Sequence, residues 1–543
     1  MSHSGVPGER CAADAGLCSE LAPTIMIQGT ASDVGKSILT AALCRIFVQD
    51  GFRTAPFKSQ NMSLNSYVTY DGKEIGRAQG VQADACRILA TTDMNPILLK
   101  PKQDMVAQVI VHGKPLRDLD ARSYRETYLP LAEQIVKDAL VRLRSSYDLV
   151  VMEGAGSPAE VNLKDRDIVN MRLAGWADSP VLLVADIDRG GVFASIVGTL
   201  EILTPEERDR VKGFIINKFR GDVTLLKPGL DWLEERTGKP VLGVIPYLHQ
   251  LGIEDEDSAS LDSKRVKRHM ASNNHTSAPH LLDIAVIRLP RLSNFTDFDP
   301  LQEEQDVHFR YIEHLSEWGT PDAVLLPGSK NTMADLLFLQ ESGLAERIVR
   351  FARDQKGWVI GICAGYQMLG EKLFDPDLLE SDIAELAGLG LLPTETVFIS
   401  DKRTLQVQGY SELFVPKGSQ RIDIDGYEIH MGRTRYVKPL DPPFQIRAKE
   451  VYHAPESKVE FHGDGASALD GHVWGTYLHG ILHNDSLRLS WLNEIRKWKG
   501  LQPVEAGLRF KEKRDMAFDK LADHVRSYLD ITRIYEMMKV SKR

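Results

Sequence analysis

Short apolar runs alternate with amphipathic stretches of helical length along most of this 543-residue chain. The runs are too short for typical helices, and several are rich in Val and Ile, which favours buried β-strands. Strands that alternate with helices are typical of βαβ units, so we expect α/β domains with mostly parallel sheets covered on both faces. In the first half of the chain the runs lie at Thr24–Gln28, Thr54–Lys58, Asp148–Met152, Pro180–Ala185, Gly213–Asn217 and Val241–Pro246, with helical patterns at Lys36–Gln49 and Tyr128–Leu143.

The alternation is interrupted by a polar segment, residues 254–280, which is dominated by charge, Ser, Asn and His. Such a composition cannot bury a core, so we expect a linker. We interpret its basic cluster Lys264–Arg268 as part of a solvated linker rather than as a binding patch. Strand-like runs then resume at Leu281–Leu289, Ala323–Leu326 and Trp358–Ile362. The predicted organisation is a leader (1–23), a first α/β domain (24–253), the linker (254–280), a second α/β domain (281–490) and a C-terminal helical extension (491–543).

The extension carries Leu521, Val525 and Leu529 at intervals of four residues, which predicts a packed amphipathic helix. We expect this helix to dock on the second domain, which precedes it in the sequence.

Charge and composition argue against several classes of protein. The chain has 66 Lys and Arg against 76 Asp and Glu, a net charge of −10, which is unlike a protein that coats nucleic acid. Apolar runs stay well short of the ~18 residues that span a bilayer, so no membrane segment is expected. The first 23 residues lack the charged-then-apolar order of a signal peptide, and 5 Cys without a C-x-x-C pair are too few for a disulfide framework. We therefore expect a cytoplasmic protein.

A glycine-containing turn joins the first strand to the first helix and ends in Gly-Lys-Ser. Glycines let the backbone curl so that successive N–H groups face one anion, and the helix N-terminus adds partial positive charge. Lys36 would reach the terminal phosphates of ATP, and the Ser37 hydroxyl would ligate Mg²⁺. The alternative is a helix-capping turn that contains Gly-Lys-Ser by chance. The predicted nucleotide site comprises Gly29, Thr30, Ser32, Asp33, Gly35, Lys36 and Ser37.

Polar residues also follow other strands of the first domain. One apolar run ends in Glu153, where a P-loop enzyme holds the carboxylate that orients Mg²⁺ or its water. Asp188 and Arg189 follow another strand and would contact substrate or nucleotide, or pair with each other across a turn. Lys58 and Asn61 are placed similarly after the second strand. Open α/β sheets bind ligands at this carboxyl edge.

In the second domain, Cys363 stands between an apolar strand and a helical pattern, flanked by Gly361 and Gly365. Small residues permit a tight strand–turn–helix that exposes a nucleophile, and the helix N-terminus favours the thiolate. The alternative, an inert core cysteine, leaves the Gly-x-Cys-x-Gly-x-Gln context unexplained. A nucleophilic cysteine needs a base, and His479, in the run Gly-Thr-Tyr-Leu-His-Gly, is our candidate. The competing histidines are His430 and His483.

A site of this kind also needs an oxyanion hole. The backbone N–H groups of Gly328 and Ser329, in the loop after the run Ala323–Leu326, are placed to form one half, and the N–H of Ala364 is placed to form the other.

Two motifs resemble known families. The loop Gly-Thr-x-Ser-x-x-Gly-Lys-Ser, whose first Gly stands one residue earlier than in G-x-x-x-x-G-K-[ST], resembles the variant loop of dethiobiotin synthetase and the MinD-like ATPases. The Cys elbow, the distal His and the Pro-Gly-Ser loop resemble a class I glutamine amidotransferase domain. Such domains often carry His-Pro-Glu, with the Glu orienting the imidazole, but here His479 is followed by Gly480 and Ile481. The third triad member is therefore missing or comes from elsewhere.

Taken together, the chain resembles the cobyrinic/cobyric acid amidotransferase family over roughly residues 24–530. The resemblance implies a P-loop NTPase-like, dethiobiotin synthetase-like domain followed by a glutamine amidotransferase domain. It also implies amidation of the b, d, e and g carboxylates of adenosylcobyrinic acid a,c-diamide, with ATP and Mg²⁺ activating the carboxylate and glutamine supplying nitrogen. The segments that carry it are Ile27–Ser37, Pro56–Asn65, Glu74–Gln79, Asp186–Gly191, Ser293–Pro300 and the runs around Cys363 and His479.

Three other interpretations stay open. The a,c-diamide synthases of the same family share both domain types, although the run Lys58–Asn65 favours enzymes that act on the other four carboxylates. A MinD-like switch ATPase would carry an amphipathic membrane helix after the first domain, where this chain has a second catalytic-looking domain. A cysteine hydrolase with a regulatory P-loop would act without ATP.

Overall fold

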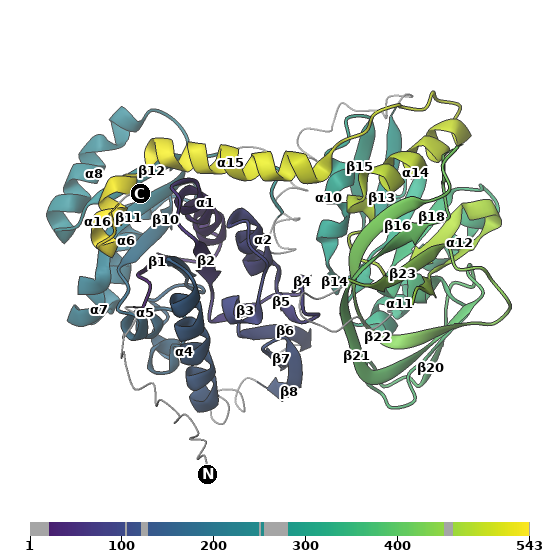
Figure 1. The fold of residues 1–543 in the computed structure, drawn as a ribbon, viewed down its shortest axis with the longest axis horizontal. Coiled ribbons are helices and arrows are strands. Elements are labelled where there is room, and N and C mark those ends of the chain that lie inside the picture. Colours follow the sequence, from purple (N-terminus) through teal and green to yellow (C-terminus); the bar gives the residue numbers. More distant parts are fainter. Residues whose placement is uncertain are drawn as a thin grey trace, which may run out of the picture.

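The computed structural model of the chain describes residues 21–103, 106–120, 129–248, 251–254, 281–416, 418–449 and 460–541. Two lobes are visible in Figure 1, the first running from β1 to β12 and the second from β13 to α14. The long helix α15 (Phe510–Tyr528) reaches from one lobe to the other. Most of the predicted leader and nearly all of the predicted linker lie outside the described residues.

The first lobe is built on a six-stranded sheet in the order β12-β11-β10-β1-β9-β2, in which every neighbouring pair is parallel. Its central strand β1 is buried along its whole length, as expected for a strand covered on both faces. Apolar runs predicted all six strands, and the predicted α/β fold class is confirmed. The strands are β1 (Thr24–Gly29), β2 (Thr54–Phe57), β9 (Leu149–Glu153), β10 (Val181–Asp186), β11 (Val211–Phe219) and β12 (Val241–Pro246).

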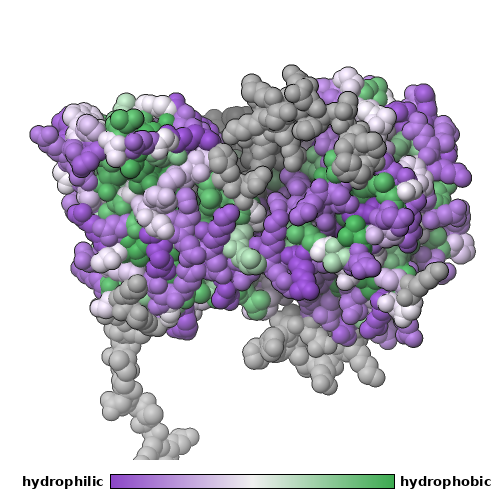
Figure 2. Space-filling view, turned by 90° about the horizontal axis from the view of Figure 1, so that it is seen from above, coloured by the Kyte–Doolittle hydropathy of each residue, from purple (hydrophilic) through white to green (hydrophobic). Residues whose placement is uncertain are grey.

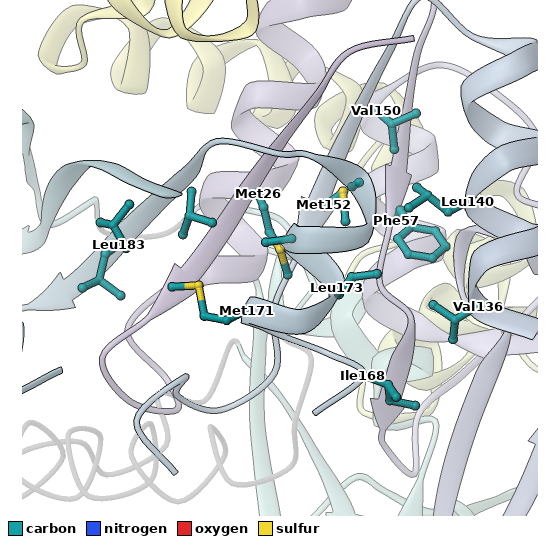
Figure 3. Close-up of a cluster of buried hydrophobic side chains, with 14 of the residues drawn as sticks. Met26, Phe57, Val136, Leu140, Val150, Met152, Ile168, Met171, Leu173 and Leu183 are labelled. Atoms are coloured by element: carbon teal, nitrogen blue, oxygen red, sulfur yellow. The ribbon is translucent and has the colours of Figure 1, made fainter. Parts of the chain in front are cut away.

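Helices cover both faces of this sheet. Alternate side chains of β1 enter different cores: Met26 joins a cluster with α4, and Ile25 joins a cluster with α1. Figure 3 shows the first cluster, in which Val136 and Leu140 of α4 lie beside Phe57 of β2. The helices are α1 (Lys36–Gln49), α2 (Arg77–Ala85), α4 (Leu129–Ser146), α5 (Met171–Ala177), α6 (Val192–Ile202), α7 (Pro205–Arg210) and α8 (Val223–Thr237).

The second lobe has its own six-stranded sheet, in the order β15-β13-β16-β18-β26-β25. Its pairs are parallel except for β25–β26, which is antiparallel. The strands are β13 (Leu282–Ile287), β15 (Val307–Ile312), β16 (Ala323–Leu326), β18 (Trp358–Ile362), β25 (Ala466–Ala468) and β26 (Val473–Thr476). The helices are α10 (Asp299–Gln302), α11 (Thr332–Glu341), α12 (Leu344–Arg353), α13 (Ala364–Leu369) and α14 (Asp485–Trp498).

Further sheets that were not predicted complete both lobes; most of their strand pairs are antiparallel, and β3–β6 and β19–β21 are parallel. The longest strands, β21 (Thr394–Ser411) and β22 (Ile422–Tyr436), form a hairpin whose side chains are only partly buried. Such strands lack the continuous apolar run that marks a buried parallel strand. The others are β3 (Gln60–Met62), β4 (Ser66–Val68), β5 (Glu74–Gly76), β6 (Ile97–Gln103), β7 (Val106–Val111), β8 (Lys114–Asp120), β14 (Leu292–Ser293), β17 (Gly328–Ser329), β19 (Lys372–Phe374), β20 (Glu385–Ala387), β23 (Phe444–Ala448) and β24 (His462–Asp464).

The C-terminal helices pack on the first lobe, so the expectation that the terminal helix docks on the second domain is wrong. Leu521 of α15 lies in the same buried cluster as Phe47 of α1, and α16 (Ile531–Met538) extends that cluster. Arg45 of α1 is fully buried and pairs with Asp519 of α15 at 3.1 Å. An apolar stripe predicts that a helix packs, but it does not identify the surface on which the helix packs.

The described residues contain no helix that could span a membrane. None of the helices described is long and apolar enough to cross a membrane. Hydrophilic residues cover most of the described surface on the face shown in Figure 2.

Candidate active sites

The first candidate site lies where β1 passes into α1. Gly35 has a φ of 96°, and a Cβ at Gly29 would lie 2.6 Å from another side chain of the loop, so the turn requires glycine at both positions. The Lys36 ammonium donates to the carbonyl oxygens of Ala31 (2.9 Å) and Gly156 (3.1 Å). The loop therefore curls around the lysine that the sequence analysis assigned to phosphate binding. The same turn contains Thr30, Ser32, Asp33 and Ser37.

The Glu153 carboxylate is fully buried at the end of β9, and three polar side chains donate to it. Ser37 Oγ lies 2.8 Å and Lys58 Nζ 2.9 Å from Oε1, and Gln82 Nε2 lies 2.6 Å from Oε2. A serine hydroxyl and a carboxylate are oxygen ligands of the kind that Mg²⁺ takes beside nucleotide phosphates, so this donor set fits the ion. Gln82 was not predicted, because nothing in its local sequence distinguishes it from any other helical glutamine.

The remaining polar residues predicted for this site take separate partners. Arg189 lies 3.5 Å from Asp33 of the phosphate loop, so it borders the same turn. Asp188 pairs with Arg220 at 3.0 Å. Asn61 is buried, and its amide donates to the Gln79 side chain at 3.1 Å.

The second candidate site begins at Cys363, which joins β18 to α13. Its φ of 54° lies in the left-handed region, which is strained for a residue with a side chain. The turn depends on Gly361 and Gly365, where an added Cβ would lie 2.5 Å and 2.0 Å from backbone atoms. This geometry places the thiol at the carboxyl edge of the parallel sheet, with the residue only 6% exposed.

His479 follows β26, the parallel neighbour of β18, so the imidazole and the thiol emerge at the same edge of the sheet. Its Nδ1 lies 2.7 Å from Oδ2 of Asp297, and the other carboxylate oxygen accepts from the Gly480 N–H at 2.8 Å. Tyr427 stacks on the imidazole with ring centroids 5.2 Å apart. A carboxylate and an aromatic ring therefore hold His479 in one orientation.

Asp297 occupies the place of the third triad member, for which the sequence analysis had no residue. It lies in the short helix η4 (Phe295–Phe298) and is 182 residues away from His479 in the chain. The run Ser293–Pro300 contains it, but local spacing cannot connect an acid to a histidine so far along the sequence. The connection is made by the fold.

The charges around His479 favour its protonated form. Burial by itself lowers the pKa of an imidazole, but the neighbouring Asp297 and Cys363 outweigh it and raise the pKa of His479 to about 10. An imidazole that is stabilised as the cation beside a thiol is suited to accept that thiol's proton.

The two competing histidines have different surroundings. His483 Nε2 lies 2.9 Å from the carbonyl oxygen of Thr296, and burial lowers the pKa of His483 to about 4. His430 stacks on Tyr477 with ring centroids 3.7 Å apart and lies 3.4 Å from Glu428. His430 lines the same pocket as Cys363, whereas the Cys363 side chain forms a hydrogen bond with His479.

The residues predicted for an oxyanion hole border the same site. A Cβ at Gly328 would lie 3.0 Å from Cε1 of His479, so this loop passes directly over the imidazole. Ser329 and Ala364 line a pocket together with Cys363. The Ser329 hydroxyl donates to Asp335 at 2.6 Å, which fixes the loop.

The pocket beside Cys363 is lined by side chains from both lobes. Lys100 comes from β6 of the first lobe, and Lys330, Gln367 and Glu380 come from the second. The lining therefore offers both cationic and anionic groups, as a zwitterionic amino acid requires. The Gln367 amide is fixed by hydrogen bonds to the backbone of Met431 (3.0 Å) and to Thr332 (3.0 Å).

Comparison with known proteins finds a matching domain family for each lobe. Residues 25–260 match the family model of the CobQ/CobB/MinD/ParA nucleotide binding domain, and residues 283–487 match the CobB/CobQ-like glutamine amidotransferase domain. The cobyric acid synthase of Desulforamulus reducens is 52% identical over 523 residues, which cover 95% of this chain and 98% of the relative. The cobyric acid synthase of Geobacillus sp. (strain WCH70) is 49% identical over 519 residues, which cover 96% and 98%. That of Dehalococcoides mccartyi (strain CBDB1) is 50% identical over 521 residues, which cover 95% and 99%.

Proposed function

The chain belongs to the cobyric acid synthase family, and from this we propose that it amidates the b, d, e and g carboxylates of adenosylcobyrinic acid a,c-diamide. Glutamine supplies the nitrogen and ATP activates each carboxylate. The two domains divide the reaction: the second lobe releases ammonia and the first lobe consumes it.

The glutaminase half proceeds at Cys363. Its thiol proton passes to Nε2 of His479, the thiolate attacks the side-chain amide carbon of glutamine, and backbone N–H groups of the adjoining loops stabilise the oxyanion. The imidazolium, which Asp297 stabilises at 2.7 Å, then donates its proton to the amide nitrogen, the C–N bond breaks, and neutral NH3 leaves as the thioester forms. Water hydrolyses the thioester and returns the free enzyme.

The ligase half proceeds at the phosphate loop. A carboxylate is a poor electrophile, and phosphorylation by ATP neutralises its charge and supplies a leaving group. Lys36 would contact the terminal phosphates, while Ser37 and Glu153 would hold Mg²⁺, which screens phosphate charge when bound. Lys58, which lies 2.9 Å from Glu153, would contact either the phosphate or the substrate carboxylate. Asn61, Asp188 and Arg189 are proposed contacts at the same sheet edge.

Ammonia is an effective nucleophile only while it stays unprotonated, so we infer that it passes between the sites through the protein interior. The inference is supported by the pocket beside Cys363, because Lys100 of the first lobe forms part of its wall. The glutaminase pocket therefore borders the lobe in which the ammonia would be used.

One observation supports this proposal most directly. The Asp297–His479 pair lies beside Cys363 in a chain that also has a phosphate loop. The test is phosphate release from ATP in the presence of glutamine, with and without adenosylcobyrinic acid a,c-diamide. We expect turnover that depends on the corrinoid, with mass increments for successive conversions of carboxylate to amide. Corrinoid-independent ATP hydrolysis without amide formation would contradict the proposed acceptor.

A further inference from the structure

Two carboxamide oxygens beside the phosphate loop are buried without a hydrogen-bond donor. They are Oε1 of Gln28, in β1, and Oδ1 of Asn170, directly before α5, and the two residues are 0% and 5% exposed. Neither oxygen has a partner among the described residues. Because folded proteins pair nearly all of their buried polar groups, these two acceptors call for a donor that the chain itself does not supply.

The amide nitrogens fix which way the two oxygens face. Nδ2 of Asn170 donates to the carbonyl oxygen of Ala155 at 2.7 Å, and Nε2 of Gln28 donates to the sulfur of Met26 at 3.3 Å. A carbonyl oxygen and a thioether sulfur only accept hydrogen bonds, so neither amide can exchange its nitrogen and oxygen. Asn170 is also the N-cap residue of α5, but its side chain makes no capping hydrogen bond.

Both side chains border Gly154, the residue that follows β9. A Cβ at Gly154 would lie 2.3 Å from Oδ1 of Asn170 and 3.1 Å from Cγ of Gln28, so only glycine lets the two amides approach this backbone. Met26 and Met171, which lie close to the two amides in the sequence, belong to one buried cluster (Figure 3). We call Gln28, Gly154 and Asn170 the amide site.

The amide site adjoins the groups that we assign to Mg²⁺ and phosphate. Successive residues of a strand face opposite sides, so Glu153 faces Ser37 of α1 while Gly154 faces the two amides. Two residues further on, the Gly156 carbonyl accepts from Lys36 at 3.1 Å. A molecule in the amide site would therefore lie at the same edge of the sheet as the phosphorylated substrate.

The chemistry of the amide site suits ammonia. Ammonia has three N–H bonds, so it can donate to both oxygens while its lone pair stays free to attack. The two oxygens are uncharged, whereas a carboxylate in their place would stabilise the ammonium cation, which has no lone pair. Water, with two O–H bonds, is the other small molecule that would satisfy both oxygens.

We propose that Gln28 and Asn170 bind the ammonia that attacks the activated carboxylate. The inference rests on the proposed function for the presence of an acyl phosphate. The nitrogen lone pair forms the C–N bond, and the bond between the acyl carbon and the phosphate oxygen breaks. One proton of the ammonia leaves with the phosphate as HPO₄²⁻, so an acyl phosphate dianion and ammonia give the amide and hydrogen phosphate.

The test is Gln28→Met, which keeps an unbranched side chain of similar length and removes its acceptor. Amidation of the corrinoid is measured with ammonium chloride as the only nitrogen donor. We expect the KM for ammonia to rise about fivefold, the factor that corresponds to one hydrogen bond of ordinary net strength, and the KM for ATP to stay unchanged. With glutamine as the donor, more glutamate should form per amide, because ammonia that is not held is lost.

Thr24→Val is the matched control. Thr24 lies at the other end of β1 and is 3% exposed, and its hydroxyl likewise has no hydrogen-bond partner among the residues described. We expect this variant to keep the wild-type KM for ammonia. An equal rise in both variants would show that loss of any buried oxygen from the strand has this effect, and the proposal would be wrong. An unchanged KM in Gln28→Met would leave the amide site to water, which also overturns the proposal.

Gly154→Ala tests the amide site without altering either amide. Its Cβ would displace Oδ1 of Asn170, so the KM for ammonia should rise at least as much as in Gln28→Met. The KM for ATP and the thermal unfolding temperature verify that each variant is folded. A wild-type enzyme that amidates the corrinoid, with variants that keep its KM for ammonia, would overturn the amide site alone. A wild-type enzyme that forms no amide with either nitrogen donor would instead contradict the proposed function.

Discussion

The two candidate sites occupy the same position on similar sheets, but they are assembled differently. At the phosphate loop, the residues from Gly29 to Ser37 are contiguous in the sequence. The strand that leads into this loop, β1, is the neighbour of β9, which ends in Glu153. At the glutaminase site, Asp297, His479 and Cys363 come from three distant segments of the chain. A phosphate site relies on successive backbone N–H groups, which one loop can supply, whereas proton transfer needs side chains that only the fold can align.

The division of labour between the sites is tested most strongly by Cys363→Ala. Glutamine-dependent amidation should fall by about 10⁴–10⁶-fold, the scale seen when a triad nucleophile is removed. Amidation with free ammonia should stay near the wild-type rate, because the ligase site in the other lobe is untouched. Product analysis by mass spectrometry with each nitrogen donor measures both. Loss of the ammonia-driven reaction would mean that the two sites are not separable.

The relay in the second lobe is tested by Asp297→Asn, which keeps the shape of the side chain and removes its charge. Glutaminase activity should fall by roughly 10²–10⁴-fold, the contribution of an oriented general base. In the wild type the pKa of His479 is raised to about 10, so its contribution to the free energy of unfolding is present below pH ~6.5 and lost as the pH rises toward 10. Without the Asp297 charge, burial dominates and the pKa of His479 falls.

The measurements for Asp297→Asn are kcat/KM for glutamine and the free energy of unfolding, each as a function of pH. The variant should lack the loss of stability that the wild type shows on the alkaline side. A variant with wild-type activity and an unchanged pH profile would remove Asp297 from the relay.

The contiguous loop of the first lobe is tested by Lys36→Ala. Amidation should fall by about 10²–10³-fold with either nitrogen donor, the cost of removing one group that stabilises transition-state charge. Glutamine hydrolysis without ATP should be unaffected, because Lys36 lies in the phosphate loop of the first lobe, where it donates to the carbonyl oxygens of Ala31 and Gly156. A parallel fall in the basal glutaminase rate would contradict the separation of the sites.

The smallest effect is expected at Gln82, which orients the Glu153 carboxylate at 2.6 Å. Gln82→Ala should raise the Mg²⁺ concentration for half-maximal ATP hydrolysis by about 10–100-fold, as loss of a residue that orients a metal ligand does. Gln134→Ala is the control, because Gln134 donates at 2.7 Å to Asp138 on the exposed side of α4. An equal shift in both variants would exclude a specific role for Gln82.

The same contrast explains what could be predicted from the sequence. Buried parallel strands leave continuous apolar runs, so the strands around Ile25, Val151 and Ile360 were predicted correctly. The phosphate loop and the Cys363 elbow are local motifs, and each requires glycine at particular positions of its turn. Such features are visible in the sequence because the residues that need each other are neighbours.

The features that the sequence analysis missed depend on long-range contacts. Asp297 reaches His479, Gln82 reaches Glu153, and α15 packs on α1, each across a large separation in the chain. The partly exposed strands of the β21–β22 hairpin alternate apolar and polar side chains too irregularly to be distinguished from loops. The partners of all these residues and elements are determined by tertiary packing, and a local sequence pattern holds no information about such packing.

The central claim is that ammonia made at Cys363 is consumed at the phosphate loop without leaving the protein. The direct test supplies glutamine labelled with ¹⁵N in its side-chain amide, together with an excess of unlabelled ammonium, and measures the isotope in the amides of the corrinoid product. The account predicts that the new amides carry the ¹⁵N label of the glutamine almost undiluted. Amides that carry the isotopic composition of the bulk ammonium would show that the two sites communicate only through solvent.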